Sequence, residues 1–157
     1  MFRPVLLALS LLLPVLLPPV VALAEPPRAT PEARAQASDW FIGHWAHQSH
    51  LDAPDFGPGL LRADMVVRAD RTLELTGSFT QDGATIPATS LRMTATWWME
   101  DADPLGLRVR LENDIYIEDG APPQSGGLET NVMNLEIRPD GTLVDFDDGI
   151  TWTRRGP

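Results

Sequence analysis

Hydrophobic and polar residues alternate along most of the chain. The clearest example is the segment 72–80, where leucine or phenylalanine occupies three odd positions and threonine, glutamate or serine the even ones. The segment 90–99 repeats the pattern, with Leu91, Met93 and Trp97 on one parity and mainly polar residues on the other. Because successive side chains of a β-strand point to opposite faces, this alternation predicts strands with one buried and one solvated face.

Eight such segments are predicted, and most are joined by short turns rich in Asp, Gly and Pro. No helical pattern between them is long enough for a parallel crossover, so the sheet is predicted to be antiparallel. One-sided alternation favours a single sheet rolled around one apolar interior, an all-β, eight-stranded antiparallel up-and-down barrel. A β-sandwich is the alternative, because the same pattern suits both folds. The predicted strands are 40–48, 61–68, 72–80, 90–99, 107–112 (with an extension to residue 117 left open), 130–138, 142–146 and 150–154.

The N-terminal residues are typical of a signal peptide. Arg3 gives a basic start, residues 5–13 are almost unbroken aliphatic, and Ala22-Leu23-Ala24 supplies the small residues of a cleavage site. The apolar run is short and broken by prolines, whereas a spanning helix needs about 20 apolar residues. We therefore predict a signal peptide over 1–24, cleaved near Ala24, a periplasmic or secreted protein, and no stable membrane anchor after cleavage. An uncleaved anchor is the alternative.

The mature chain is predicted to contain an arm and one domain. Residues 25–38 are rich in proline and alanine, and Thr30-Pro31-Glu32 has the cap, the first-turn proline and the acid of a helix start. We predict a short helix over 31–38 that leads into a barrel domain over 39–157.

Composition narrows the possible chemistry. The chain has no cysteine and no lysine, so disulfides, thiolate metal sites and Schiff-base catalysis are excluded. Its formal net charge of −10 repels phosphate backbones, and no basic stripe offsets it. Nucleic acid is therefore not an expected partner.

The two ends of the predicted barrel carry a family resemblance. Gly43-His44-Trp45 on the first predicted strand is similar to the lipocalin G-x-W, and the segment 148–154 resembles the closing strand of such domains. On these residues the chain resembles the calycin superfamily. Within that superfamily it is most similar to the small lipocalin-like domains of exported bacterial proteins. The resemblance implies a barrel that holds a small hydrophobic ligand.

Three residues are predicted to close the barrel. Gly43 would let the strand bend so that the indole of Trp45 lies under the barrel floor. Arg154 or Arg155 of the last strand would stack on that indole through a cation–π contact. The assignment of Gly43, Trp45 and Arg154 is structural.

The interior parity is nearly all apolar, and an eight-stranded barrel is either just filled by its side chains or leaves room for one small ligand. His47 shares the parity of Trp45 and would be a polar group of the lumen. The lumen candidates are His47, Phe79, Met93, Trp97, Val109 and Met133.

The histidines fall close together, within 44–50. Imidazoles and carboxylates are zinc ligands, but residues 44 and 47 of one strand point to opposite faces. His47, His50 and Asp52 converge only if the strand has given way to loop, so they are weak metal candidates. The acids around 100–103 and 145–148 are assigned to turns.

No catalytic residue and no cofactor are assigned, because no serine lies in a nucleophile-elbow context and no phosphate-binding glycine loop is present. The first functional hypothesis is an exported protein that binds a small hydrophobic or amphipathic molecule in an apolar lumen. Another is a metal-handling protein or small barrel enzyme that uses His47 and His50.

A further hypothesis is an envelope protein-interaction module with a filled barrel. It would display the loop 119–129 or an outer face formed by Arg92, Arg108, Arg110 and Trp98. A solvated outer wall is the simpler interpretation of these arginines, and no particular protein partner is predicted.

Overall fold

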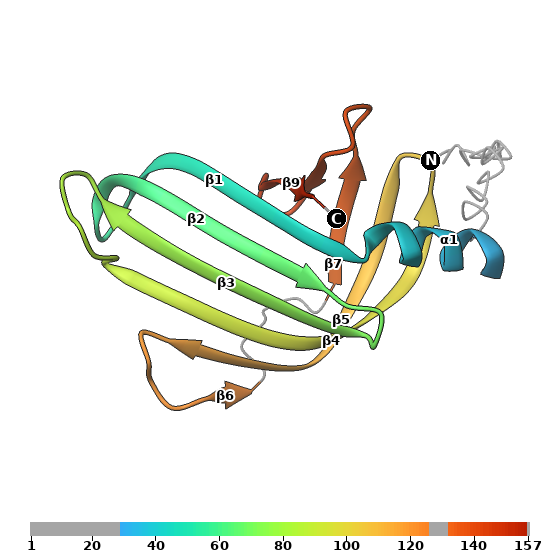
Figure 1. Cartoon of the computed structure of the whole chain (residues 1–157), viewed down its shortest axis with the longest axis horizontal. Coiled ribbons are helices and arrows are strands. Elements are labelled where there is room, and N and C mark those ends of the chain that lie inside the picture. The colour runs from blue at the N-terminus through green and yellow to red at the C-terminus, as the bar shows by residue number, and fades with distance from the viewer. Residues whose placement is uncertain (1–28, 126–131, 157) are drawn as a thin grey trace, which may run out of the picture.

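A computed structural model describes residues 29–125 and 132–156 of the chain (Figure 1). It contains one helix, α1 (Pro31–Phe41), followed by strands that form one antiparallel sheet. None of the helical segments in these ranges is long and apolar enough to cross a membrane. The strands are β1 (Gly43–Ala53), β2 (Gly57–Val67), β3 (Thr72–Gln81), β4 (Thr89–Asp103), β5 (Gly106–Glu118), β6 (Gln124–Ser125), β7 (Val132–Ile137), β8 (Leu143–Asp145) and β9 (Thr151–Arg155).

Eight of these strands close into a ring. Neighbours along the chain pair from β1 through β5, then β5 pairs with β7, and β9 returns to β1. The predicted eight-stranded antiparallel up-and-down barrel is therefore confirmed, and the sandwich alternative is wrong. The two-residue β6 is an additional strand that pairs with Ile115 and Tyr116 of β5. β6 itself lies inside the segment 119–129, which was predicted to be a loop.

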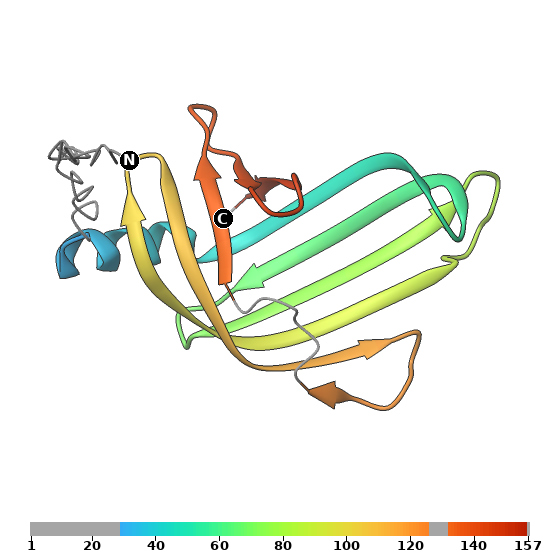
Figure 2. The same cartoon turned by 180° about the vertical axis from the view of Figure 1, so that it is seen from behind.

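The ring is complete over only part of its length. β1 pairs with β2 along all of its residues, but with β9 only from His44 to Ala46. β5 likewise pairs with β7 only over 106–110. Figures 1 and 2 show the long strands β1 to β4 running well past β7 and β9. We call the end where α1 packs against the barrel the closed end, and the opposite end, toward which β1 to β5 continue beyond β7, β8 and β9, the open end.

Helix α1 is longer than predicted, because its last residues are buried by the barrel. The predicted helix ended at residue 38 and the first strand began at Trp40, whereas α1 continues to Phe41. Phe41 is fully buried and packs edge-on against Trp97, with ring centroids 5.5 Å apart. The start is as predicted, since the Thr30 side chain accepts a hydrogen bond from the backbone of Ala33 at 3.2 Å.

The closure contacts predicted from sequence are present. Trp45 is fully buried, and its Nε1 donates to the carbonyl of Phe41 at 2.9 Å. The guanidinium carbon of Arg154 lies 4.7 Å from the Trp45 ring centroid and 5.4 Å from that of Trp40. Gly43 has a φ of +153°, a backbone conformation that residues with a Cβ rarely adopt, and it lies directly beside the guanidinium of Arg154.

Several strand boundaries differ from the prediction. β1 extends to Ala53 instead of residue 48, and β4 extends to Asp103 instead of 99. β5 takes the longer form that the sequence left open, with register shifts against β4 between Thr94 and Thr96 and between Met99 and Asp101. Irregular pairing of this kind hides the strict alternation on which strand prediction depends.

Candidate functional site

A cavity of about 280 Å³ occupies the barrel lumen. It begins where the packed closed end stops: Met65, which pairs in register with Trp45, lines it. Its walls come from β2, β3, β4, β5 and β7, from β9, and from the hairpin between β8 and β9. The lining residues are Met65, Leu73, Leu75, Met93, Leu111, Val132, Met133, Asp145, Asp147, Asp148, Ile150 and Trp152.

The floor of the cavity is apolar and rigidly packed. Met65, Leu73 and Leu111 are at most 3% exposed, and Trp152 is equally buried. Such side chains belong to the close-packed core on one side and face the lumen on the other. The floor therefore offers a preformed apolar surface to a ligand.

The rim of the cavity is the hairpin 145–150. Its backbone is fixed by hydrogen bonds from Asp145 N to Ile150 O and from Gly149 N to Asp145 O, each 2.8 Å. The Asp145 carboxylate also accepts the backbone N–H of Asp147 at 3.0 Å. The prediction that these acids serve a turn is thus confirmed for Asp145, but the turn places three carboxylates beside the lumen.

The position of Asp145 affects its protonation. It is only 8% exposed, and this burial raises the pKa of its carboxyl group, because a charge is less stable away from water. The nearby carboxylates of Asp148 and Asp147 raise the pKa further, while the backbone N–H groups of the turn oppose them. Asp147 and Asp148 themselves are exposed, so negative charge extends from the lumen wall to solvent.

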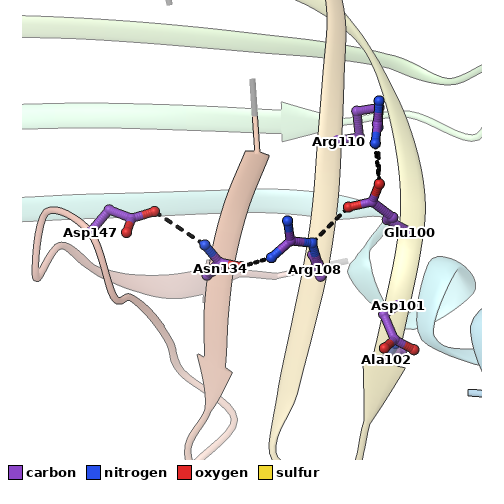
Figure 3. Close-up of polar contacts among 7 residues, drawn as sticks. All are labelled: Glu100, Asp101, Ala102, Arg108, Arg110, Asn134 and Asp147. Atoms are coloured by element: carbon purple, nitrogen blue, oxygen red, sulfur yellow. Dashed lines mark hydrogen bonds and ion pairs between the residues drawn. The ribbon is translucent and has the colours of Figure 1, made fainter. Parts of the chain in front are cut away.

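A chain of polar contacts ties the rim to the outer wall (Figure 3). The Nδ2 of Asn134 donates to Asp147 at 3.4 Å, and Arg108 donates to the Oδ1 of Asn134 at 3.2 Å. Arg108 also donates to Glu100 at 2.7 Å, and Glu100 accepts a second arginine, Arg110. These side chains lie on β4, β5 and β7, so the rim is anchored to the long strands of the barrel.

His47 lies beside the cavity and does not line it. Its ring is 6.0 Å from that of Trp152, its Nδ1 is 2.9 Å from the Thr151 carbonyl oxygen, and its Nε2 is 2.9 Å from the Ser49 hydroxyl. With the proton on Nδ1, the ring donates to Thr151 and accepts from Ser49. A neutral carbonyl orients this Ser–His pair, so a developing imidazolium lacks the carboxylate that supports it in hydrolase triads.

The metal hypothesis is not supported by the geometry of β1. Because β1 remains a strand to Ala53, His47 and His50 point to opposite faces. His50 instead contacts both carboxylate oxygens of Asp82 at 2.9 and 3.0 Å, and Asp52 is exposed. Among the described residues, no three His, Cys, Asp or Glu side chains are arranged to hold a metal ion.

Two of the six predicted lumen residues, Met93 and Met133, line the cavity. Trp97 and Val109 are fully buried in the closed end, where they fill the interior. Phe79 is 5% exposed and packs on Phe56 at 5.9 Å between ring centroids, beyond the cavity in the open end. Parity correctly places these side chains inside the barrel, but it carries no information on how deep the packed region extends.

Sequence reasoning missed Trp152 and the three aspartates as lining residues. Trp152 shares the parity of Arg154, one of the two arginines predicted to stack on Trp45, and that shared parity is a usable signal. The aspartates gave no such signal, because a turn at the barrel exterior and a turn over the lumen have the same composition.

The arginines of the predicted outer patch form ion pairs with glutamates. Arg92 pairs with Glu74 at 2.9 Å, and both Arg108 and Arg110 pair with Glu100. Hydrogen bonds from Arg110 and Arg108 hold the pKa of Glu100 below its usual range, and Arg68, together with Arg92, does the same for Glu74. The glutamates thus offset part of the positive charge that would recruit an anionic partner.

Several predicted features fall partly or wholly outside the described residues. The signal peptide over 1–24 does so completely. The arm 25–38 does so up to residue 28, and the strand 130–138 does so at its first two residues. The loop 119–129 does so from residue 126 onward, and its described part contains β6.

A larger hollow of about 630 Å³ lies at the closed end. It is formed by α1, the β4–β5 turn and the β7–β8 turn, and its walls include Ala33, Ala37, Trp40 and Ile137. It shares no lining residue with the lumen cavity, and it brings together one arginine and one aspartate without a cluster of like charge. The lumen cavity is therefore the better candidate site.

Comparison of the chain with protein-family models, curated proteins and solved structures gives no significant match. The lumen cavity is accordingly interpreted from its own residues.

Proposed function

We propose that this protein is an exported binding protein, periplasmic or secreted, that holds a small hydrophobic or amphipathic molecule in its barrel lumen. The observation that carries the proposal is the lumen cavity, whose apolar floor is left uncovered by the packed closed end. Sites for small molecules are concave and mainly apolar, with a few polar groups that fix orientation. The floor and the aspartate rim correspond to these two parts.

The size of the cavity limits the ligand. The volume of about 280 Å³ lies just below the range of about 300–1,000 Å³ that is usual for ligand sites, so the cavity suits a small molecule. A longer molecule would continue along the concave face of the open end. Leu51 and Leu91, which share the inward parity of Trp45 and Met93, are 37% and 38% exposed there. The resemblance to lipocalin-like domains supports the same proposal.

The first test is whether the protein carries a ligand from its own compartment. We expect native mass spectrometry of protein purified from the periplasm or medium to show a bound small molecule. Met133→Trp, which fills the cavity, should remove it, because the indole would occupy the lumen. The control Ile86→Trp introduces the same side chain at a position that is 74% exposed and should retain the ligand.

A second readout is the melting temperature in the presence of simple amphiphiles. Octylamine, octanol and octanoate have the same tail and differ in the charge of the head group. If none of them raises the melting temperature of the wild type, and the native mass is that of the bare chain, the proposed function is wrong.

A further inference from the structure

We propose that the ligand is an amphipathic cation, such as a protonated amine or a quaternary ammonium compound. Its apolar part would lie on the lumen floor and its positive charge against Asp145 and Asp148, because the carboxylate of Asp147 is directed to Asn134 on the way to the outer wall. This inference rests on the proposed function and specifies the chemical class of its ligand.

The first argument is the charge of the cavity wall. Three carboxylates line the cavity, and no arginine or histidine is among the described residues that line it. An ion within this rim would therefore experience negative charge on one side and apolar side chains on the other. Electrostatic attraction is stronger next to a low-dielectric wall than in open water.

The second argument is the contrast with acids elsewhere on the protein. Glu74 and Glu100 each pair with two arginines, and Asp82 pairs with His50. In the described part of the chain, by contrast, the rim aspartates form no ion pair with a basic side chain. Among the described residues, the side chain of Asp147 is bonded to the neutral amide of Asn134. The rim thus has uncompensated negative charge, which a bound cation would balance.

The third argument is the geometry of the buried rim residue. Asp145 is fixed by the hairpin and by its hydrogen bond with the backbone of Asp147, so its carboxylate needs no rearrangement to meet a ligand. A preorganised charge contributes more to affinity than one on a mobile side chain. The raised pKa of Asp145 agrees with a carboxylate that lacks a cationic partner.

Trp152 supplies an aromatic surface to the lumen. It lines the cavity and is 3% exposed. The indole face would also attract a cation within about 6 Å of the ring centroid.

The experiment compares octylamine, octanol and octanoate at about pH 7.5, where the amine is protonated and octanoate is ionised. Binding is measured by calorimetry for the wild type, Asp145→Asn, Asp148→Asn and the double variant. Asparagine retains an oxygen that accepts the turn hydrogen bond, so the hairpin is expected to persist. Asp140→Asn is the matched control, because Asp140 also accepts from its own turn, at Thr142, but does not line the cavity.

We expect the wild type and Asp140→Asn to bind octylamine about tenfold more tightly than octanoate, with octanol between them. Each rim substitution should reduce this ratio, and the double variant should bind the amine and octanoate with nearly equal affinity. Added salt should weaken only the binding of the amine.

The outcomes separate this inference from the proposed function. Equal binding of all three compounds by the wild type would overturn the cation inference and leave lumen binding intact. A preference for the amine that persists in the double variant would also overturn it, because the charge would then act elsewhere. Absence of binding by all three compounds would overturn both proposals.

Discussion

The closed end and the open end of this barrel share strands, yet their interiors are packed differently. At the closed end, Trp45, Trp97 and Phe41 fill the space between the walls, and Arg154 stacks on Trp45. On the other side of this layer the apolar lining is mainly aliphatic, and a cavity of about 280 Å³ remains. Aromatic side chains therefore fill the interior at the closed end, and smaller aliphatic side chains leave space beyond it.

The difference separates stability from binding. The closed end has complete backbone pairing and a packed core, so it can stabilise the fold without help from a ligand. The open end can then retain uncompensated carboxylates on its rim. Residues of the two ends should therefore respond to substitution in opposite ways, and the comparison can be tested from the largest expected effect to the smallest.

The largest effect is expected for an aromatic residue of the closed end. Trp97→Ala should reduce the free energy of unfolding by about 3–5 kcal/mol, because it leaves a cavity in a fully packed core. Met133→Ala removes a half-buried side chain that already faces a cavity, and should reduce it by about 1–2 kcal/mol. Urea denaturation measures both values. Equal losses would show that the two ends are packed alike.

A smaller effect is expected for the cation beneath the floor. Arg154→Ala removes stacking on two indoles and a hydrogen bond to the Trp40 carbonyl, and should cost about 1–2 kcal/mol. Its neighbour Arg155 has a 61% exposed side chain and only a 3.7 Å ion pair with Asp64. Arg155→Ala should therefore change the stability by less than about 0.5 kcal/mol. If Arg155→Ala costs as much as Arg154→Ala in urea denaturation, the stacking has no special role.

The smallest effect is a dependence on pH at the open end. The folded state raises the pKa of Asp145 above the ordinary value of 3.8, so its ionisation opposes folding. Wild-type protein should match Asp145→Asn below that value and become the less stable of the two as the pH rises through the raised pKa.

Asp140 is the control for this measurement, because hydrogen bonds from Thr142 lower its pKa. Ionisation of Asp140 favours folding, so Asp140→Asn should be the less stable protein at neutral pH and match the wild type at low pH. Urea denaturation at about pH 3 and about pH 7 tests both signs. A difference of the same sign for both variants would contradict the assigned environments.

The outline of the barrel and its floor could be predicted from the sequence, because both depend on local patterns. Alternation over 72–80 and the order Gly43-His44-Trp45 are readable without knowledge of distant contacts. The extension of α1 to Phe41 could not be predicted, since it depends on burial of that ring against Trp97.

The candidate site was predictable only in part. Met93 and Met133 follow from parity, but the position of the cavity depends on how far the large side chains fill the interior. The aspartates of the rim suit a turn, so the sequence gives no sign that they also line the lumen cavity. Only the closing of β9 on β1 brings the hairpin over the lumen.

The closure between β1 and β9 has a consequence for how the chain acquires its fold. Thr153 bonds to a residue 107 positions earlier, and Arg154 to one 114 positions earlier, so the ring depends on contacts between opposite ends of the sequence. The hairpins from β1 to β5 join neighbours and can form early, whereas the last strand must wait until the whole chain is available. Until then Trp45 lacks the cation that covers it. Residues 151–155 thus complete the fold last, and a chain that ends before them would keep an exposed, aggregation-prone barrel floor.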